Sequence, residues 1–408
     1  MKVHVKKRSS VNGTVAKLMQ AKDILENNFQ ERGEVIRGVL LALLCRHNVL
    51  LVGPPGTAKS MLGTAVFRMF RRSKMFVQQC TKQMTEDAVF GIPNIKTMQE
   101  EGYIEYNTEN MLPQADFAFL EEFMDASEGV LRSMLDILNE RVFRKGRQNF
   151  DCPLRTAIAT TNYIEEHEVL QAVLDRFLVK IQVNLLEKED SVKQMLQNTS
   201  KSALNVSELP EFSLKELDEL YEKVNGIQMP EVMIDFFIKL VKETVKESGG
   251  TLFISDRRKC WALRIACASV VLDGRDTLTE QDFEDCKYGL VKVGFEEEEQ
   301  WFQTAMLGLL DTFKSTMLIT GQLDSVEGAI AKITNNLQKT QLTETALVSI
   351  NKHTAIVVAT LKKVIIDETD AFAEVLHRRM ALVDKANELA KTACFVYEEW
   401  LRREKKLT

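Results

Sequence analysis

The sequence has no hydrophobic run long enough to cross a membrane. Its longest apolar stretch, residues 35–45, is interrupted by Arg37, whereas a transmembrane helix needs about 20 apolar residues. The basic residues at the start, within residues 1–10, are followed by no apolar core and no small-residue cleavage site, so nothing marks the protein for export. We therefore expect a cytoplasmic protein without membrane insertion.

Paired cysteines and an excess of positive charge are also missing. The seven cysteines are an odd number without CxxC spacing, which disfavours a disulfide framework and a zinc site. Cys260 and Cys267 are one heptad apart in a helical pattern, and we expect both to be buried free thiols. The net charge of −6 argues against a surface whose main task is to bind nucleic acid.

Helix breakers are missing from the last part of the chain. All seven prolines lie between Pro54 and Pro230, and the last glycine is Gly328. Apolar residues beyond residue 320 follow a 3-4 spacing, which predicts two or three long antiparallel helices. The pattern leaves open whether these helices form an arm that reaches a partner or a domain that closes on itself. The spaced residues are Leu323, Val326, Ile330, Ile333, Leu337, Leu347, Ile350, Thr354, Val357, Leu361 and Val364.

The 408 residues are enough for two or three domains. Up to residue 185, short apolar runs alternate with helical patterns, which indicates an α/β domain with a largely parallel sheet. The next segment is helical, so we expect an all-α lid over residues 186–295 and a helical hairpin or bundle over residues 296–408. The predicted strands cover residues 49–52, 75–79, 117–120 and 156–160.

The most informative motif is a strand that leads into a glycine-rich turn. Backbone N–H groups of such a turn, together with the start of the following helix, bind a phosphate chain. Lys59 would neutralise phosphate oxygens and Ser60 would hold Mg²⁺. Ala58 stands where the strict motif has glycine, and we expect a negative φ there. The predicted nucleotide-binding residues are Gly53, Pro54, Pro55, Gly56, Thr57, Ala58, Lys59, Ser60 and Met61.

Two acids follow the apolar run of residues 117–120. Glu121 is placed to support hydrated magnesium, and Glu122 is placed to polarise the attacking water. The first acid of such a pair is usually aspartate. Glu121 is one methylene longer, and magnesium tolerates little distortion of its shell. Weak metal support, slow turnover and simple accommodation by a shifted backbone therefore all stay open. The alternative is that both acids merely start a solvated helix.

Polar residues follow two later apolar segments. Asn162 ends the strand over residues 156–160, where its amide can hydrogen-bond a γ-phosphate or the lytic water, although Thr-Asn is also a common turn. Arg176 follows Asp175 and is placed to enter the nucleotide site of a neighbouring subunit. The alternative for Arg176 is a local surface pair with Asp175.

The order of these motifs, followed by a helical region, resembles the AAA+ ATPases, and within them the MoxR branch and its RavA-like members. Residues 81–91, 138–146 and 255–258 resemble further motifs of that branch. The resemblance covers about residues 15–295. It implies a P-loop core, in which a parallel sheet has helices on both faces, plus an all-α lid; the long C-terminal helical domain lies outside it.

The resemblance also implies roles and partners. It implies an ATPase that uses ATP and Mg²⁺, forms a homo-hexameric ring, and remodels or matures a partner protein with a von Willebrand factor A (vWA) domain in a chaperone-like way. The implied catalytic residues are the base Glu122, the first sensor Asn162, the trans-acting finger Arg176, and the second sensor Arg257, with Arg258 as a possible substitute.

Two segments resemble the inserts of this branch. Residues 102–108 alternate like a hairpin, and residues 141–151 predict a second hairpin with a turn at Gly146. The second hairpin is basic, so it is placed to contact DNA or an acidic protein segment, although a solvated turn is also possible. Its cations are Arg141, Arg144, Lys145 and Arg147. Two alternatives to a protein remodeller stay open. The basic hairpin leaves open a DNA-directed motor, and Glu121 in place of the usual aspartate leaves open a nucleotide-gated scaffold with slow hydrolysis.

Overall fold

The structure is a computed structural model that describes residues 2–164, 173–199, 208–338, 343–363 and 373–407. The chain forms two compact units, Met1–Met306 and Leu307–Thr408. The three domains drawn from the sequence, residues 1–185, 186–295 and 296–408, stay a prediction. Within the described residues, no helix combines the length and apolar character needed to cross a membrane.

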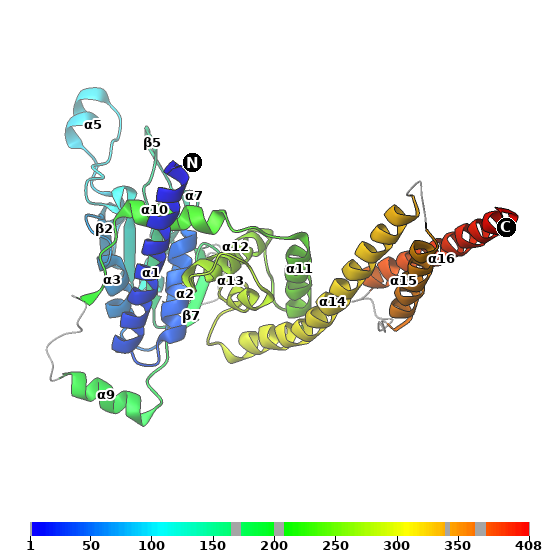
Figure 1. The fold of residues 1–408 in the computed structure, drawn as a ribbon. Coiled ribbons are helices and arrows are strands. Elements are labelled where there is room, and N and C mark those ends of the chain that lie inside the picture. The colour runs from blue at the N-terminus through cyan, green and yellow to red at the C-terminus, as the bar shows by residue number, and fades with distance from the viewer. Residues whose placement is uncertain (1, 165–172, 200–207, 339–342, 364–372, 408) are drawn as a thin grey trace. The chain divides into compact units, whose positions relative to one another are not determined.

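A five-stranded parallel sheet with the order β2-β3-β6-β1-β7 forms the centre of the first unit. Figure 1 labels its strands β2 and β7. The four predicted strands are confirmed. The fifth strand, β7, was not predicted because Lys180 and Gln182 interrupt its apolar pattern. The strands are β1 (Val49–Val52), β2 (Met75–Gln79), β3 (Phe117–Glu121), β6 (Thr156–Thr161) and β7 (Val179–Gln182).

Helices cover both faces of this sheet, as predicted. Leu51 and Phe119 point into one core, whereas Leu50 and Leu120 point into another, because successive side chains of a strand face opposite ways. The first core is formed with α1 (Lys2–Asn28), α2 (Gly33–Cys45) and α3 (Lys59–Arg68). The second is formed with α4 (Asp87–Phe90), α6 (Glu128–Ser133) and α7 (Leu135–Glu140).

The strand order reverses at β1. After β1 the chain crosses to β2 at one end of the sheet, whereas β7 pairs with the other side of β1. Ligands of open α/β sheets bind at such a reversal, outside the carboxyl ends of the strands. Val52, at the end of β1, lies in register with Thr161 of β6 and Gln182 of β7. The loops that follow β1, β3 and β6 therefore share one edge of the sheet.

The basic hairpin prediction is confirmed, and the other hairpin prediction is wrong. Strands β4 (Val142–Lys145) and β5 (Gln148–Asp151) pair antiparallel. Residues 102–108 instead follow the helix α5 (Ile95–Glu101) and form only the isolated bridge between Tyr106 and Pro93. The pairing does not extend beyond this bridge, because Asn94 caps α5 and the residues that follow it form the helix. Two 3₁₀ turns, η1 (Leu112–Gln114) and η2 (Phe123–Asp125), flank β3.

The helical region after β7 is confirmed. Its helices are α9 (Glu189–Thr199), α10 (Leu214–Asn225), α11 (Glu231–Glu247), α12 (Asp256–Leu272), η4 (Glu280–Cys286) and α13 (Lys287–Leu290). Helix α10 begins with a capping box between Ser213 and Glu216. The expectation for the two cysteines of α12 is half wrong, because Cys267 is buried but Cys260 is exposed. Ala262 is the first buried residue of α12 and continuous burial starts only at Ile265, so the start of the helix, which includes Cys260, is not covered.

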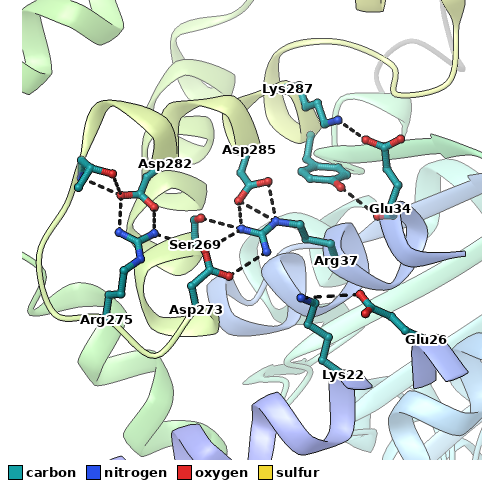
Figure 2. A network of polar contacts seen from close by, with 12 residues as sticks. Lys22, Glu26, Glu34, Arg37, Ser269, Asp273, Arg275, Asp282, Asp285 and Lys287 are labelled. Carbon is teal, nitrogen blue, oxygen red and sulfur yellow. Dashed lines mark hydrogen bonds and ion pairs between the residues drawn. The ribbon is translucent and has the colours of Figure 1, made fainter. Parts of the chain in front are cut away.

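A network of ion pairs joins α2 to this helical region (Figure 2). The guanidinium of Arg37 contacts Asp285 at 2.6 Å and Asp273 at 2.9 Å, and it donates to the Ser269 hydroxyl at 3.0 Å. Lys287 pairs with Glu34 beside it. The side chains of Arg37 and Asp285 are only 24% and 9% exposed, so the network is a largely desolvated contact between α2 and the helical region.

Three long helices continue to the C-terminus: α14 (Glu296–Leu337), α15 (Glu344–Lys363) and α16 (Ala373–Leu407). The spaced apolar residues of α14 and α15 pack with α16 into one core, which favours the domain that closes on itself over an extended arm. Val364 lies outside the described residues. The buried members are Leu323, Val326, Ile330, Ile333, Ile350, Val357, Leu361, Leu382, Ala386, Leu389 and Ala393.

Candidate functional site

The phosphate-loop residues connect the end of β1 to the start of α3, which begins at Lys59. Gly53 must be glycine, because a Cβ atom there would lie 2.1 Å from the carbonyl oxygen of Val183. Gly56 has φ +80°, which L-residues rarely adopt. The conformation of the loop therefore depends on two glycines. Gly56 allows the backbone to turn with a positive φ, and Gly53 leaves room for the backbone of Val183.

The expectation for Ala58 is wrong, because its φ is +64°. Ala58 is the N-cap of α3 and adopts the left-handed conformation with ψ 20°. The turn requires this conformation to bring the chain from Thr57 into the first residue of the helix. For an L-residue it costs about 1–2 kcal/mol. The turn is thus maintained with alanine in a position that favours glycine.

The ammonium group of Lys59 lies inside the loop. Its Nζ atom donates to the carbonyl oxygens of Gly53 at 2.5 Å and Pro54 at 2.8 Å. Lys59 is buried, and burial lowers its pKa, against the opposing effect of the Glu122 carboxylate. A positive charge that is poorly hydrated and surrounded by backbone dipoles is well suited to meet an anionic ligand.

Ser60 and Met61 begin the exposed side of α3. They line a shallow pocket of about 280 Å³ together with Thr64, Ala65 and Arg68. Ser60 is exposed and Met61 is 47% exposed. The position of Ser60, directly after Lys59 at the helix start, leaves its hydroxyl accessible next to the loop.

The two acids occupy the carboxyl end of β3. Glu121 is its last residue, and its carbonyl oxygen accepts a hydrogen bond from the N–H of Cys80 at 2.8 Å. Glu122 has φ +49°, an uncommon conformation that occurs often at functional sites. The alternative for these acids was the start of a solvated helix. No α-helix begins directly after them, because the next residues form the short 3₁₀ turn η2.

Asn162 lies beside Glu122. The Nδ2 atom of Asn162 donates to both carboxylate oxygens of Glu122, at 2.9 and 3.1 Å. A second link joins the same two loops, since the Tyr163 hydroxyl donates to Asp125 at 2.7 Å. The ends of β6 and β3 are thus connected by polar side chains that reach from one strand to its neighbour.

The donor set fits magnesium. The predicted ligands are the hydroxyl of Ser60 and the carboxylate of Glu121, and both are oxygen donors of the kind that Mg²⁺ prefers. Glu121 is half-buried at the strand end, and Ser60 is exposed. One or two protein oxygens suit an ion that keeps several waters and binds phosphate at the same time.

Asp175 contacts both Arg176, the candidate trans-acting finger, and Arg257, the candidate second sensor. The carboxylate of Asp175 lies 3.8 Å from Arg176 and 3.4 Å from Arg257, which projects from the start of α12. Arg257 also lies over the ring of Trp261. Arg258 instead donates to the carbonyl oxygen of Gly289 at 3.1 Å, inside the helical region, and burial lowers its pKa. The local pair of Asp175 and Arg176 is therefore present, with Arg257 as a third member.

The cations of the hairpin β4–β5 have partners within the protein. Arg144 contacts Glu140 at 2.6 Å, and Lys145 contacts Glu86 and lies over the ring of Phe90. The guanidinium of Arg147 lies 4.2 Å from the ring centroid of Tyr103. The remaining cation, Arg141, donates to the backbone carbonyls of Ile137, Leu138 and Arg46.

Two further residues reach this region and were missed by sequence reasoning. Arg32, at the N-cap of α2, donates to the carbonyl oxygens of Thr57 and Asn184 at 3.5 and 2.6 Å. Glu31 accepts hydrogen bonds from backbone N–H groups just before α9. The contacts of Arg32 with Asn184 and of Glu31 with Glu187 span more than 150 residues of sequence, and no local pattern around these residues points to them.

Comparison with known proteins identifies related sequences. A sequence model of the MoxR domain in the MoxR-vWA-beta-propeller ternary systems matches residues 16–224 of the chain. An uncharacterised protein of Methanocaldococcus jannaschii is 28% identical over 268 residues, which are 66% of this chain and 68% of that protein. The chaperone MoxR1 of Mycobacterium tuberculosis is 23% identical over 262 residues, which are 61% of this chain and 67% of MoxR1.

A solved structure from Cytophaga hutchinsonii, described as a candidate ATPase, has the same fold. Its TM-score is 0.60 at 17% identity, and the match covers 76% of this chain and 98% of that one. The sequence model covers just over half of the chain and ends inside α10, so it includes the phosphate loop, both acids, Asn162 and Arg176. The chain therefore belongs to the MoxR family of AAA+ ATPases.

Proposed function

We propose that this protein binds ATP with Mg²⁺, hydrolyses it to ADP and phosphate, and uses the cycle to remodel or mature a partner protein. The observation that carries the proposal is the contact between Asn162 and Glu122. Asn162 follows β6, which neighbours the strand β1 that leads into the phosphate loop, and Glu122 follows β3 on the other side of β6. A loop for phosphate, a lysine inside it, and an oriented carboxylate at the same sheet edge are the parts that nucleotide hydrolysis requires.

Each residue has a distinct task in this mechanism. The loop N–H groups and Lys59 bind and orient the β- and γ-phosphates, while Ser60 and Glu121 would hold the magnesium ion. The ion draws negative charge from the phosphate oxygens when it is bound. Glu122 accepts the proton of the attacking water, and Asn162 keeps the Glu122 carboxylate oriented and is placed to contact the water or the γ-phosphate.

A ring of identical subunits, which we propose to be a hexamer, would complete the site. Arg176 would enter the nucleotide site of the neighbouring subunit, where its planar cation stabilises charge on the transferring group. Arg257 would contact phosphate from the helical region, exchanging its partner Asp175 for the nucleotide. We place the protein in the cytoplasm, where ATP is available and free thiols persist.

For the partner, we propose a protein with a vWA domain. The matched family model describes MoxR domains in systems with vWA and β-propeller components, and one relative is named a chaperone. The engagement of Arg144, Lys145 and Arg147 with acidic and aromatic side chains of the same chain favours a protein partner over DNA, because a DNA-binding surface presents its cations to phosphate.

The test measures ATP hydrolysis by the full chain alone, with a purified vWA-domain protein, and with duplex DNA. We expect basal hydrolysis that the vWA-domain protein changes by at least severalfold and that DNA leaves unchanged. A Lys59→Met variant is the control for contaminating ATPases and should lose activity. Stimulation by DNA that disappears on charge reversal at Arg144 and Lys145 would replace the remodeller with a DNA-directed motor.

A further inference from the structure

Arg32 connects two parts of the chain that are far apart in sequence. Its Nη2 atom donates to the carbonyl oxygen of Asn184 at 2.6 Å, and its Nε atom donates to the carbonyl oxygen of Thr57 at 3.5 Å. Its Nη1 atom donates to the carbonyl oxygen of Glu31 at 3.1 Å. Arg32 is only 7% exposed, and these three acceptors are all backbone carbonyls. One buried guanidinium thus links the phosphate loop to the chain that leaves β7.

The contact of Arg32 with the Thr57 carbonyl affects the direction of a backbone N–H group in the phosphate loop. A trans peptide unit is planar, and its carbonyl and N–H groups point in opposite directions. Because Arg32 holds the Thr57 carbonyl on its own side, the N–H of Ala58 in the same peptide unit points away from Arg32. Ala58 already adopts a left-handed φ of +64°, so this peptide unit needs support. Arg32 supplies that support from outside the loop.

Glu31 contacts the far end of the segment that leaves β7, close to the start of α9. Its two carboxylate oxygens accept hydrogen bonds from the N–H groups of Glu187 and Lys188, at 2.9 Å each. These two residues directly precede α9, where an anion is favoured by the helix N-terminus. The backbone hydrogen bonds, together with one from Ser191, lower the pKa of Glu31 to about 2. Glu31 is therefore a charged acceptor that orders the entry into α9.

The start of the connection also touches the phosphate loop directly. The N–H of Val183 donates to the carbonyl oxygen of Val52 at 2.6 Å, and Gly53 lies so close to the Val183 carbonyl that no side chain would fit. The segment of residues 183–188 is thus held by β1 and the loop at its start, by Arg32 at Asn184, and by Glu31 at its end.

We propose that Glu31 and Arg32 form a clasp that couples occupancy of the phosphate loop to the segment of residues 184–188, through which the chain enters the helical region. The inference rests on the proposed binding of ATP. Arg32 is a positioning residue: it keeps the Ala58 N–H turned away from its own guanidinium and carries a change at Thr57 to Asn184. Glu31 is the anchor that keeps the far end of the segment at α9.

The experiment combines two measurements on the full chain. Equilibrium binding of a fluorescent ATP analogue gives the Kd, and amide hydrogen exchange with and without saturating ATP reports on residues 184–188. In the wild type we expect ATP to slow exchange in this segment. In Arg32→Met we expect the Kd to rise on the order of tenfold and the ATP-dependent slowing to disappear even at saturation. Arg32→Lys keeps the charge but loses the fork geometry, so it should uncouple the segment in the same way.

Glu31→Gln separates the two halves of the clasp. We expect this variant to bind ATP within about twofold of the wild-type Kd, because it leaves Arg32 and the loop intact, while the amides of Glu187 and Lys188 exchange faster with and without ATP. Arg71→Met is the matched control, since Arg71 is an exposed arginine paired with Glu211, and it should change neither measurement. If Arg32→Met fails to fold, Arg32→Lys and Glu31→Gln decide the question.

The failures of the two proposals are distinguishable. If the wild type does not bind the ATP analogue, the proposed function is wrong and the clasp has no ligand to sense. If the wild type binds it but ATP slows exchange at residues 184–188 equally in the wild type and the Arg32 variants, nucleotide binding stands and the clasp is overturned. A loss of ATP affinity in Arg71→Met as large as in Arg32→Met would also overturn the clasp, because the effect would then not depend on the contacts of Arg32.

Discussion

The side-chain amide of Asn162 bridges both carboxylate oxygens of Glu122, at 2.9 and 3.1 Å. The two residues follow neighbouring strands, since β6 and β3 pair in parallel with Ala159 in register with Leu120. Glu122 also adopts φ +49°, so both its backbone and its side chain are constrained. A carboxylate with a fixed direction at the carboxyl end of the sheet is placed to act on a ligand held by the phosphate loop.

Replacing Glu122 with Gln should remove hydrolysis while preserving ATP binding. The amide has the same size but cannot accept the proton of the attacking water, so we expect turnover to fall by about 10²–10⁴-fold and the Kd for ATP to stay within about twofold. Phosphate release and binding of a fluorescent ATP analogue provide the two readouts. Asp125→Asn, which alters the neighbouring contact to Tyr163, is the control. Unchanged turnover in Glu122→Gln would remove Glu122 from the role of base.

Replacing Ala58 with Gly should stabilise the protein. The positive φ of Ala58 favours glycine, and this gain exceeds the entropy that glycine adds to the unfolded chain, so we expect about 0.5–1 kcal/mol of added stability. Ala58→Val should destabilise, because a β-branched residue is more strained in this conformation. Urea unfolding of the three proteins checks the order. A valine variant as stable as the glycine variant would show that the strain assigned to Ala58 is absent.

The sequence predicted the parts of the site that depend on local pattern. Apolar runs identified four of the five strands of the central sheet. The spacing of Gly53 to Ser60 identified the loop, because a strand, a turn and a helix in order form a local unit. The sign of φ at Ala58 was not predictable in this way. The sign of this φ depends on how the loop enters α3. An alanine at this position does not reveal that geometry, whereas a glycine would have suggested a positive φ.

The contacts between distant segments were beyond sequence reasoning. Arg257 meets Asp175 across 82 residues, and Arg32 meets Asn184 across 152, and neither pair has a local signal. The expected burial of Cys260 and the expected hairpin over residues 102–108 were wrong for a similar reason, since each depends on which neighbouring segment packs against these residues. The basic hairpin was placed correctly, but the acidic and aromatic partners of its cations come from other elements.

His47 should make stability depend on pH. Burial lowers its pKa from 6.5 to about 3, with the charges of Arg141 and Arg264 adding to the effect, and its ring lies against Trp261. Below pH 6.5 the unfolded chain takes up a proton at His47 and the folded chain does not, so this contribution is lost as the pH falls toward 3. Between pH 7 and pH 5 the loss is about 2 kcal/mol.

The check compares urea unfolding of the wild type and His47→Phe at pH 7 and pH 5. The phenylalanine ring keeps the packing against Trp261 without a titrating group, so its stability should fall by about 2 kcal/mol less than that of the wild type over this range. Equal losses in both proteins would mean that His47 is protonated in the folded state.

Arg37→Met should destabilise the first unit strongly. The change leaves the Asp285 carboxylate, which is 9% exposed, without its main partner, and we expect a loss of about 3 kcal/mol. Adding Asp285→Asn removes the unpaired charge and should restore at least about 1 kcal/mol of that loss. Urea unfolding measures both, with the exposed arginine variant Arg71→Met as a control within about 0.5 kcal/mol of the wild type. A loss no larger than that of the control would show that the network in Figure 2 is solvated.

The most direct test of the account is steady-state ATP hydrolysis by the wild type and Arg176→Ala, titrated across protein concentration. A site shared between subunits predicts a specific rate that rises with concentration in the wild type, because assembly supplies the arginine, and that collapses in the variant at every concentration. A wild-type rate independent of concentration and equal in Arg176→Ala would contradict a shared hydrolytic site. Tight ATP binding without hydrolysis by the wild type would contradict the ATPase and favour the nucleotide-gated scaffold.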